Sequence, residues 1–200
     1  MIRYRYKKRK CFAQGTDGVR VMNNIILPKR HSLEDAQKIV AKLKKYPFDY
    51  FHQLFRDGKL PTFGEIEGDT LGRTLVWDPK VGWLPKMGWA FIGDNPFSRW
   101  EGKRFITPFT EAKKGKGINL FRNRFFPQRN RLETSIENSL FDQKPCLIIT
   151  YPYFPSKLYG LRDELRKIDN GVFLGQGYQG YSIDKGYSLR SYFVLCSLTS

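Results

Sequence analysis

The sequence predicts a mainly β protein, an antiparallel up-and-down barrel of about eight strands with an N-terminal helical segment. Short apolar runs separated by glycine and proline recur from residue 60 to residue 198, which is typical of strands and tight turns. Aromatic residues make up 16% of the 200 residues and suit a sheet-lined interior, and a closed barrel leaves no exposed strand edge. We divide the chain into a basic arm (1–30), a helical segment packing on the barrel (31–59) and the barrel domain (60–200).

The formal net charge is +16, from 35 Lys and Arg against 19 Asp and Glu, and the excess is concentrated in residues 1–60 and 99–131. Such a field favours anionic partners, although a solvated basic surface explains it equally well. The first ten residues alternate aromatic and basic side chains, as in a disordered arm or one that follows phosphates or an anionic membrane. The predicted anion-binding residues are Lys7, Lys8, Arg9, Lys10, Arg122 and Arg124.

Cys11, Cys146 and Cys196 are widely spaced, which matches neither a disulfide framework nor a zinc site and favours a reducing compartment. The chain has two histidines, so we expect no metal centre. No run approaches the roughly 20 apolar residues of a membrane span, and no apolar stretch follows the N-terminal charges as in a secretory signal. The sequence therefore predicts a soluble intracellular protein that is not secreted.

Two amphipathic helices are predicted between residues 32 and 57. Ser32 is a good N-cap, and Asp35 three positions later can complete a capping box. His52 lies among the aromatic residues of the second helix, where packing explains it better than catalysis. Helical spacing places the apolar side chains of each helix on one face, Leu33, Ala36, Val40 and Leu43 in the first and Phe48, Phe51, Leu54 and Phe55 in the second.

The barrel strands follow from period-two patterns bounded by turn residues. In residues 111–131, phenylalanines alternate with arginines, which would suit either stacking on single-stranded nucleic acid or strands with outward arginines, and we prefer the strands. A further short strand is predicted at 18–27. The main strands are predicted at 70–78, 83–92, 100–105, 135–141, 146–151, 161–168, 172–178 and 187–198.

The charged segment 161–168 is compatible with a helix or a strand. A helix would form ordinary surface ion pairs between residues three or four positions apart. A strand would place Arg162, Glu164 and Arg166 on one face, where they could form a buried network able to hold the polar group of a ligand. Both interpretations remain open at this point.

No strong catalytic signature is present. The glycine-rich segments 64–72 and 171–180 lack the Gly-Lys-Ser/Thr of a phosphate loop, and no serine or cysteine sits in a nucleophile motif. The acidic triplet Glu65, Glu67 and Asp69 lacks histidine support for a metal. An enzyme would have to use scattered residues, among which Asp163 and Glu164 are the candidate catalytic proton carriers.

Several phrases carry a resemblance when taken in order: residues 60–61, Gly68-Asp69-Thr70-Leu71-Gly72, Trp100-x-Gly102-Lys103-Arg104-Phe105, 147–151, 162–166, 171–175 and 192–195. Together they resemble an uncharacterised lipocalin-like family that has a Gly-x-Trp-x-Gly signature and a Trp-x-Gly-Lys-x-Phe phrase. The resemblance covers residues 60–198 and implies a calycin-like barrel that holds a small apolar molecule. Thr70 stands where the signature has tryptophan. Trp77 or Trp89 would then take over the role of that tryptophan at the floor of the barrel. The resemblance supplies no catalytic residues.

We therefore predict a protein that binds a small hydrophobic or aromatic molecule of the pigment, tetrapyrrole, isoprenoid or lipid class, with its cofactor unknown and no metal. A non-catalytic role is slightly favoured. The alternatives are a basic protein that binds nucleic acid or an anionic assembly, and a barrel isomerase, cyclase or lyase. The predicted ligand-binding residues are Trp77, Trp89, Phe91, Trp100 and Phe173 in the walls, with Arg162 or Arg166 at a polar end.

Overall fold

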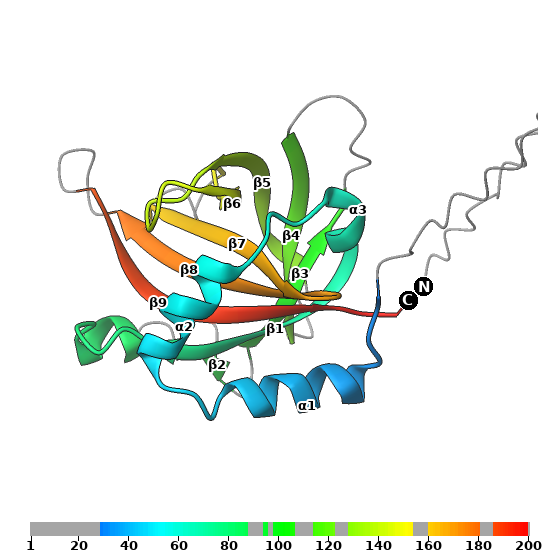
Figure 1. Ribbon diagram of the computed structural model, residues 1–200, viewed down its shortest axis with the longest axis horizontal. Coiled ribbons are helices and arrows are strands. Elements are labelled where there is room, and N and C mark those ends of the chain that lie inside the picture. The colour runs from blue at the N-terminus through cyan, green and yellow to red at the C-terminus, as the bar shows by residue number, and fades with distance from the viewer. Residues whose placement is uncertain are drawn as a thin grey trace, which may run out of the picture.

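A computed structural model describes residues 29–87, 94–95, 98–106, 114–122, 128–153, 160–180 and 186–199. Within these residues the protein is mainly β, and eight antiparallel strands in up-and-down order close into a barrel with helices on its outside (Figure 1). The predicted fold class is confirmed. The barrel strands are β1 (Gly68–Trp77), β3 (Ser98–Phe105), β4 (Lys114–Arg122), β5 (Gln128–Asn138), β6 (Pro145–Thr150), β7 (Leu161–Asp169), β8 (Val172–Gly180) and β9 (Tyr187–Ser197).

The remaining elements lie at the rim or on the outside of the barrel. The two-residue strand β2 (Asp94–Asn95) pairs with the start of β3. Helices α1 (Leu33–Leu43) and α2 (Phe48–Asp57) lie against the outer face, and α3 (Phe63–Ile66) precedes β1 at one end of the barrel. No described helix is both long and apolar enough to cross a membrane.

The barrel closes where β1 meets β3, with Gly68 opposite Phe105 and Asp69 opposite Arg104. At this seam the two backbones lie unusually close. A Cβ atom on Gly102 would lie 2.0 Å from the carbonyl oxygen of Thr70, and the φ angle of Gly102 is +148°. A glycine is therefore required at residue 102 both for space and for backbone conformation.

Thr70 is buried at this seam. Its Oγ1 donates a hydrogen bond to the carbonyl oxygen of Lys103 at 2.8 Å and accepts one from the backbone N–H of Lys103 at 3.1 Å. One hydroxyl therefore satisfies two buried backbone groups where the sheet closes on itself.

Replacing Thr70 by valine should lower the free energy of unfolding by about 2 kcal/mol, because both backbone groups of Lys103 would lose a buried partner. Urea unfolding followed by circular dichroism measures this loss. Thr70→Ser keeps the hydroxyl and serves as the matched control, for which a loss well below that of valine is expected. Equal losses in the two variants would show that the hydroxyl contributes no more to stability than the methyl group does.

The two faces of the sheet build separate apolar clusters. The inward cluster fills the barrel, and the outward cluster packs the inner sides of α1 and α2 against β1, β8 and β9. Because strand side chains alternate, Tyr192 and Val194 of β9 face the helices whereas Phe193 and Leu195 face the interior.

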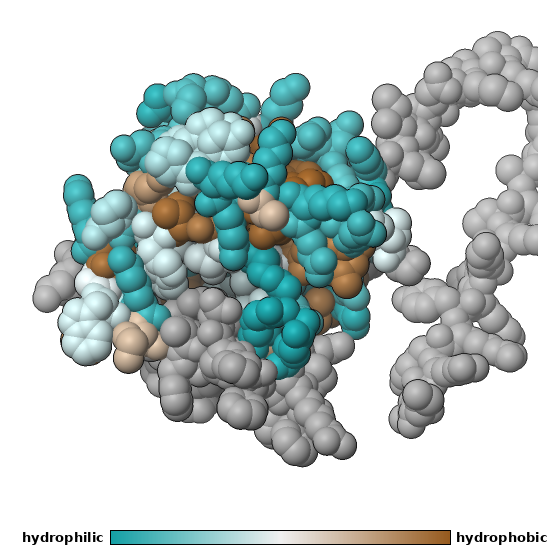
Figure 2. All heavy atoms as spheres, turned by 90° about the horizontal axis from the view of Figure 1, so that it is seen from below, coloured by the Kyte–Doolittle hydropathy of each residue, from teal (hydrophilic) through white to brown (hydrophobic). Residues whose placement is uncertain are grey.

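The N-terminal helical segment forms as the sequence predicts. Ser32 Oγ accepts a hydrogen bond from the backbone N–H of Asp35 at 3.0 Å and donates one to the Asp35 carboxylate at 2.8 Å. Ala36, Val40 and Leu43 are buried against the sheet, whereas Leu33, the first residue of the predicted apolar face, is 55% exposed. Figure 2 views the molecule from below, the side on which α1 lies in Figure 1, and hydrophilic side chains cover much of that described surface.

Two strand predictions need correction. Residues 83–87 are helical, so the predicted strand 83–92 is wrong over this part, and residues 88–93 lie outside the described residues. Pro85 falls in the first turn of this helix, where its missing N–H costs nothing. The predicted strand 135–141 ends at Asn138, and a turn follows in which Gln143 has a φ angle of +58°. The predicted strand 18–27 lies outside the described residues.

Candidate functional site

The barrel interior is divided along its axis. The half next to α3 is apolar and is filled by Ile66, Phe105, Leu132, Leu165, Phe173 and Leu195. The half toward the other end carries a polar group inside an aromatic wall. This group, the interior tetrad, consists of Lys103, Asn119, Tyr151 and Asp163.

A β-bulge brings Lys103 into the interior. The pairing of β3 with β4 shifts between Trp100 and Gly102, so that Trp100 lies opposite Phe121 and Lys103 lies opposite Asn119. In a regular strand, residues 100 and 103 would face opposite sides of the sheet, but the extra residue turns both inward. The bulge therefore explains how a lysine enters a mainly aromatic interior.

The tetrad is joined by short polar contacts. Lys103 Nζ donates to Asn119 Oδ1 at 2.9 Å and to the Tyr151 hydroxyl, and it forms an ion pair with Asp163 Oδ2 at 3.1 Å. The Tyr151 hydroxyl donates to the same Asp163 oxygen at 2.6 Å. All three N–H bonds of the ammonium group are thereby directed to partners within the tetrad.

Aromatic rings surround the ammonium group. Lys103 Nζ lies 5.3 Å from the ring centroid of Trp100, 5.1 Å from that of Tyr151 and 5.7 Å from that of Phe193. These distances fall within the range of cation–π attraction. The side chain of Lys103 is 3% exposed, so its charge is held by Asp163 and the rings rather than by water.

Burial perturbs two ionisable groups of the tetrad in opposite senses. Loss of hydration lowers the pKa of Lys103, and the charge of Asp163 opposes this change. Burial, together with the neighbouring Asp163 charge, raises the pKa of Tyr151 well above its ordinary value. Tyr151 therefore stays a neutral hydrogen-bond donor at neutral pH.

Asp163 has one occupied and one available oxygen. Its Oδ2 binds both Lys103 and Tyr151, whereas its Oδ1 accepts no hydrogen bond from the described part of the chain. The side chain is 14% exposed, which makes it the most accessible member of the Lys103–Asp163 pair. A Cβ atom on Gly177 would lie 3.6 Å from Oδ1, so the glycine leaves space beside this oxygen.

The structure brings some of the predicted ligand-binding residues to the interior and not others. Trp100 and Phe173 belong to the interior cluster, and Trp77 is half-buried where β1 ends. Trp89 and Phe91 lie outside the described residues. Asp163, one of the two candidate proton carriers, is a member of the interior tetrad.

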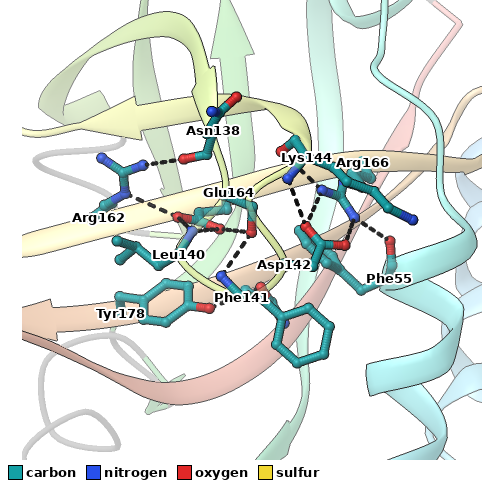
Figure 3. Close-up of polar contacts among 12 residues, drawn as sticks. Phe55, Asn138, Leu140, Phe141, Asp142, Lys144, Arg162, Glu164, Arg166 and Tyr178 are labelled. Atoms are coloured by element: carbon teal, nitrogen blue, oxygen red, sulfur yellow. Dashed lines mark hydrogen bonds and ion pairs between the residues drawn. The ribbon is translucent and has the colours of Figure 1, made fainter.

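Segment 161–168 is part of strand β7, so it is a strand and not a helix. Arg162, Glu164 and Arg166 lie on its outer face, because Leu165 between them packs into the interior. The charged network therefore forms outside the barrel, not inside it, and Arg162 and Arg166 contact protein groups there (Figure 3).

The outer-face network joins β7 to the turn before β6 and to α2 (Figure 3). Glu164 accepts hydrogen bonds from Arg162 Nε, from the backbone N–H of Leu140 and from Ser139 Oγ, which occupy both of its oxygens. Arg166 forms two hydrogen bonds to Asp142, at 2.6 and 2.7 Å. It also donates to the carbonyl oxygens of Phe55 and Lys144.

The predicted anion-binding residues fall largely outside the described residues, namely Lys7, Lys8, Arg9, Lys10 and Arg124. Arg122 is described, and its Nε forms an exposed ion pair with Glu101 at 2.9 Å. Among the described residues, no group of three or more His, Cys, Asp or Glu is arranged to hold a metal ion. His52 packs between Phe48 and Phe141, and its Nδ1 lies 2.7 Å from the Tyr192 hydroxyl.

Sequence reasoning missed Lys103, Asn119 and Tyr151. Lys103 stood within the Trp100-x-Gly102-Lys103 phrase, but a strand period without the bulge points it outward. Tyr151 directly follows the apolar run of β6. Nothing in the sequence indicates that its hydroxyl binds Asp163, which lies 12 residues later. A signal that could have drawn attention to Lys103 was its place two residues before Phe105, because residues two apart share one face of a strand.

No family model matches this sequence, and no curated protein matches it either. Among solved structures, the chain is similar to a protein from Thermomonospora curvata described as "Crystal structure of protein from Thermomonospora curvata". The sequence identity is 14% and the TM-score is 0.47, over 82% of this chain and 99% of the other.

Proposed function

We propose that the barrel binds a small, uncharged and mainly apolar or aromatic molecule whose carbonyl or hydroxyl group meets the interior tetrad. The observation that carries this proposal is a mutually bonded ammonium, phenol and carboxylate set among the rings of Trp100, Tyr151 and Phe193. Binding sites for small molecules combine apolar walls with a few convergent polar groups in this way.

The charge balance of the tetrad favours a neutral ligand. Lys103 and Asp163 already neutralise each other, so a carboxylate ligand would meet Asp163 and a cationic ligand would meet Lys103. Either charged ligand would lose its hydration and would find no opposite charge in the tetrad that is free to pair with it. A carbonyl oxygen can accept from Tyr151 or Lys103, and a hydroxyl can donate to Asp163 Oδ1, with no uncompensated charge.

The aromatic wall supports an apolar or aromatic ligand body. Trp100 lies edge-on to Phe193, with ring centroids 5.7 Å apart, and both rings border Lys103. Phe121 lies opposite Trp100 across the β3–β4 pair. Such rings offer large flat surfaces for contact with a ring or polyene.

We also propose that the chain is a relative of the lipocalin-like family that its sequence resembles. The support is that the members of its Trp-x-Gly-Lys-x-Phe phrase have distinct tasks in the barrel. Trp100 and Lys103 build the site, Gly102 permits the closing seam, and Phe105 fills the apolar half.

The proposal is tested with three compounds that share one naphthalene ring: methyl naphthyl ketone, naphthylmethanol and naphthoate. Quenching of tryptophan fluorescence reports binding beside Trp100. We expect the ketone and the alcohol to bind at least about tenfold more tightly than the carboxylate, a difference of about 1.4 kcal/mol. Tyr151→Phe should weaken ketone binding about fivefold, the value of one hydrogen bond.

The control is Arg122→Ala, which removes a basic residue from the outside of the barrel and should leave all three affinities unchanged. Tighter binding of naphthoate than of the ketone would refute the neutral-ligand proposal. Absence of binding by every member of the series would refute ligand binding at this site.

A further inference from the structure

We propose that the interior tetrad catalyses proton transfer at the carbon next to a ligand carbonyl, with Asp163 as the base and Lys103 and Tyr151 as donors to the carbonyl oxygen. This inference rests on the proposed function, because it needs a neutral carbonyl compound in the site. It assigns the protein an activity, carbon-acid enolisation, and a substrate class, uncharged apolar or aromatic ketones.

The first step of the argument is the asymmetry of Asp163. Oδ2 is held by Lys103 and Tyr151, whereas Oδ1 has no described donor and has the space left by Gly177 beside it. A base needs an oxygen that is free to approach a C–H bond. Asp163 provides one within the same carboxylate that orients the two donors.

The second step is the placement of the donors. Tyr151 OH lies 2.6 Å and Lys103 Nζ 3.1 Å from Asp163 Oδ2, so both donors point to the position of that oxygen. A ligand carbonyl oxygen placed beside Oδ2 can share these hydrogen bonds while the carboxylate stays in place. Donors set in a site with little water stabilise the negative charge that develops on an enolate oxygen.

The reaction balances without a cofactor. Asp163 takes a proton from the α-carbon, and the electron pair of that C–H bond forms the carbon–carbon double bond of the enolate. The π pair of the carbonyl moves to its oxygen, which accepts hydrogen bonds from Lys103 and Tyr151. If the proton on Asp163 is replaced by one from solvent before it returns to the same carbon, the result is hydrogen exchange, and return to a conjugated carbon of an unsaturated ketone gives isomerisation.

Glu164, the neighbouring candidate, does not fit this task. Both of its oxygens accept hydrogen bonds from Ser139, Leu140 or Arg162, and the side chain is fully buried on the outer face of β7. It therefore lacks both a free oxygen and a path to a ligand in the interior.

The test follows loss of the methyl proton signal of methyl naphthyl ketone by nuclear magnetic resonance in deuterium oxide, with the full chain at neutral pH. We expect the protein to raise the exchange rate at least about a hundredfold above buffer, the usual contribution of a positioned base. Asp163→Asn should lose at least about a hundredfold of this rate while ketone quenching of tryptophan fluorescence changes less than about threefold. Tyr151→Phe should exchange about tenfold more slowly than the wild type.

The matched control is Asp142→Asn. It makes the same substitution in the ion pair that Asp142, in the turn before β6, forms with Arg166 on the outer face of β7. It should keep the wild-type exchange rate, even where it lowers the melting temperature. If Asp163→Asn does not fold, Tyr151→Phe decides, and an unchanged rate in it overturns the inference. Ketone binding without exchange by the wild type overturns the inference and leaves the proposed function intact, whereas absence of ketone binding overturns both.

Discussion

Gly102→Ala is expected to prevent the barrel from closing. The new methyl group would lie 2.0 Å from the backbone oxygen of Thr70 and 2.8 Å from the backbone nitrogen of Gly72, and neither atom can move without opening the β1–β3 seam. The φ angle of +148° adds strain for any residue with a Cβ atom. We expect a loss of about 4 kcal/mol or more, which is comparable to the whole stability of many domains.

Near-ultraviolet circular dichroism and urea unfolding measure the effect of this substitution. Gly64→Ala is the matched control, because a Cβ atom there meets nothing within 4 Å and the residue lies in helix α3. It should be neutral or slightly stabilising, since alanine favours a helix more than glycine does. A Gly102→Ala protein with wild-type stability would show that the seam is looser than the structure indicates.

The sequence predicted those parts of the fold that depend on neighbouring residues. The Ser32 cap, the apolar stripes of both helices and most strands follow from local patterns and are present, except that Leu33 of the first stripe is exposed. The error at residues 83–87 has a local cause as well, because a run with Trp83, Leu84 and Met87 suits a strand or a short helix equally. Tertiary context decides such runs.

The site depends on register, which the sequence did not reveal. The bulge between Trp100 and Gly102 decides that Lys103 faces inward, and the inward position of Leu165 decides that Arg162 and Arg166 face outward. A shift of one residue exchanges the two faces of a strand, so each choice is all or none. Trp100, Phe173 and Asp163 could be identified from residue type, whereas Lys103, Asn119 and Tyr151 needed the pairing of strands.

Asp163→Ala is expected to destabilise the protein by about 3–5 kcal/mol at neutral pH, because it leaves the Lys103 ammonium buried without its counter-charge. In the wild type, burial already lowers the pKa of Lys103 and Asp163 opposes that change, so the substitution should lower the pKa of Lys103 further. The unfolded chain then binds a proton on Lys103 that the folded variant gives up.

Because of this difference in proton binding, the stability lost in Asp163→Ala depends on pH in a definite direction. Where the unfolded state holds more protons than the folded state, the free energy of unfolding rises with pH. The penalty of Asp163→Ala should therefore shrink as pH rises through the window between the pKa of Lys103 in the variant and its less strongly lowered pKa in the wild type. Tyr151, whose pKa is raised, opposes this trend above about pH 10, so the comparison is made between about pH 6 and about pH 9.

Urea unfolding of the wild type and of Asp163→Ala at several pH values measures the penalty directly. The control is the double variant Lys103→Met with Asp163→Leu, which removes both charges and fills the space with apolar atoms. It should be more stable than Asp163→Ala and show no added pH dependence, because no buried charge remains to be neutralised. A penalty that is below about 1 kcal/mol, or constant across the pH range, would mean that water reaches Lys103 and that the interior is not the low-dielectric site on which the proposed chemistry depends.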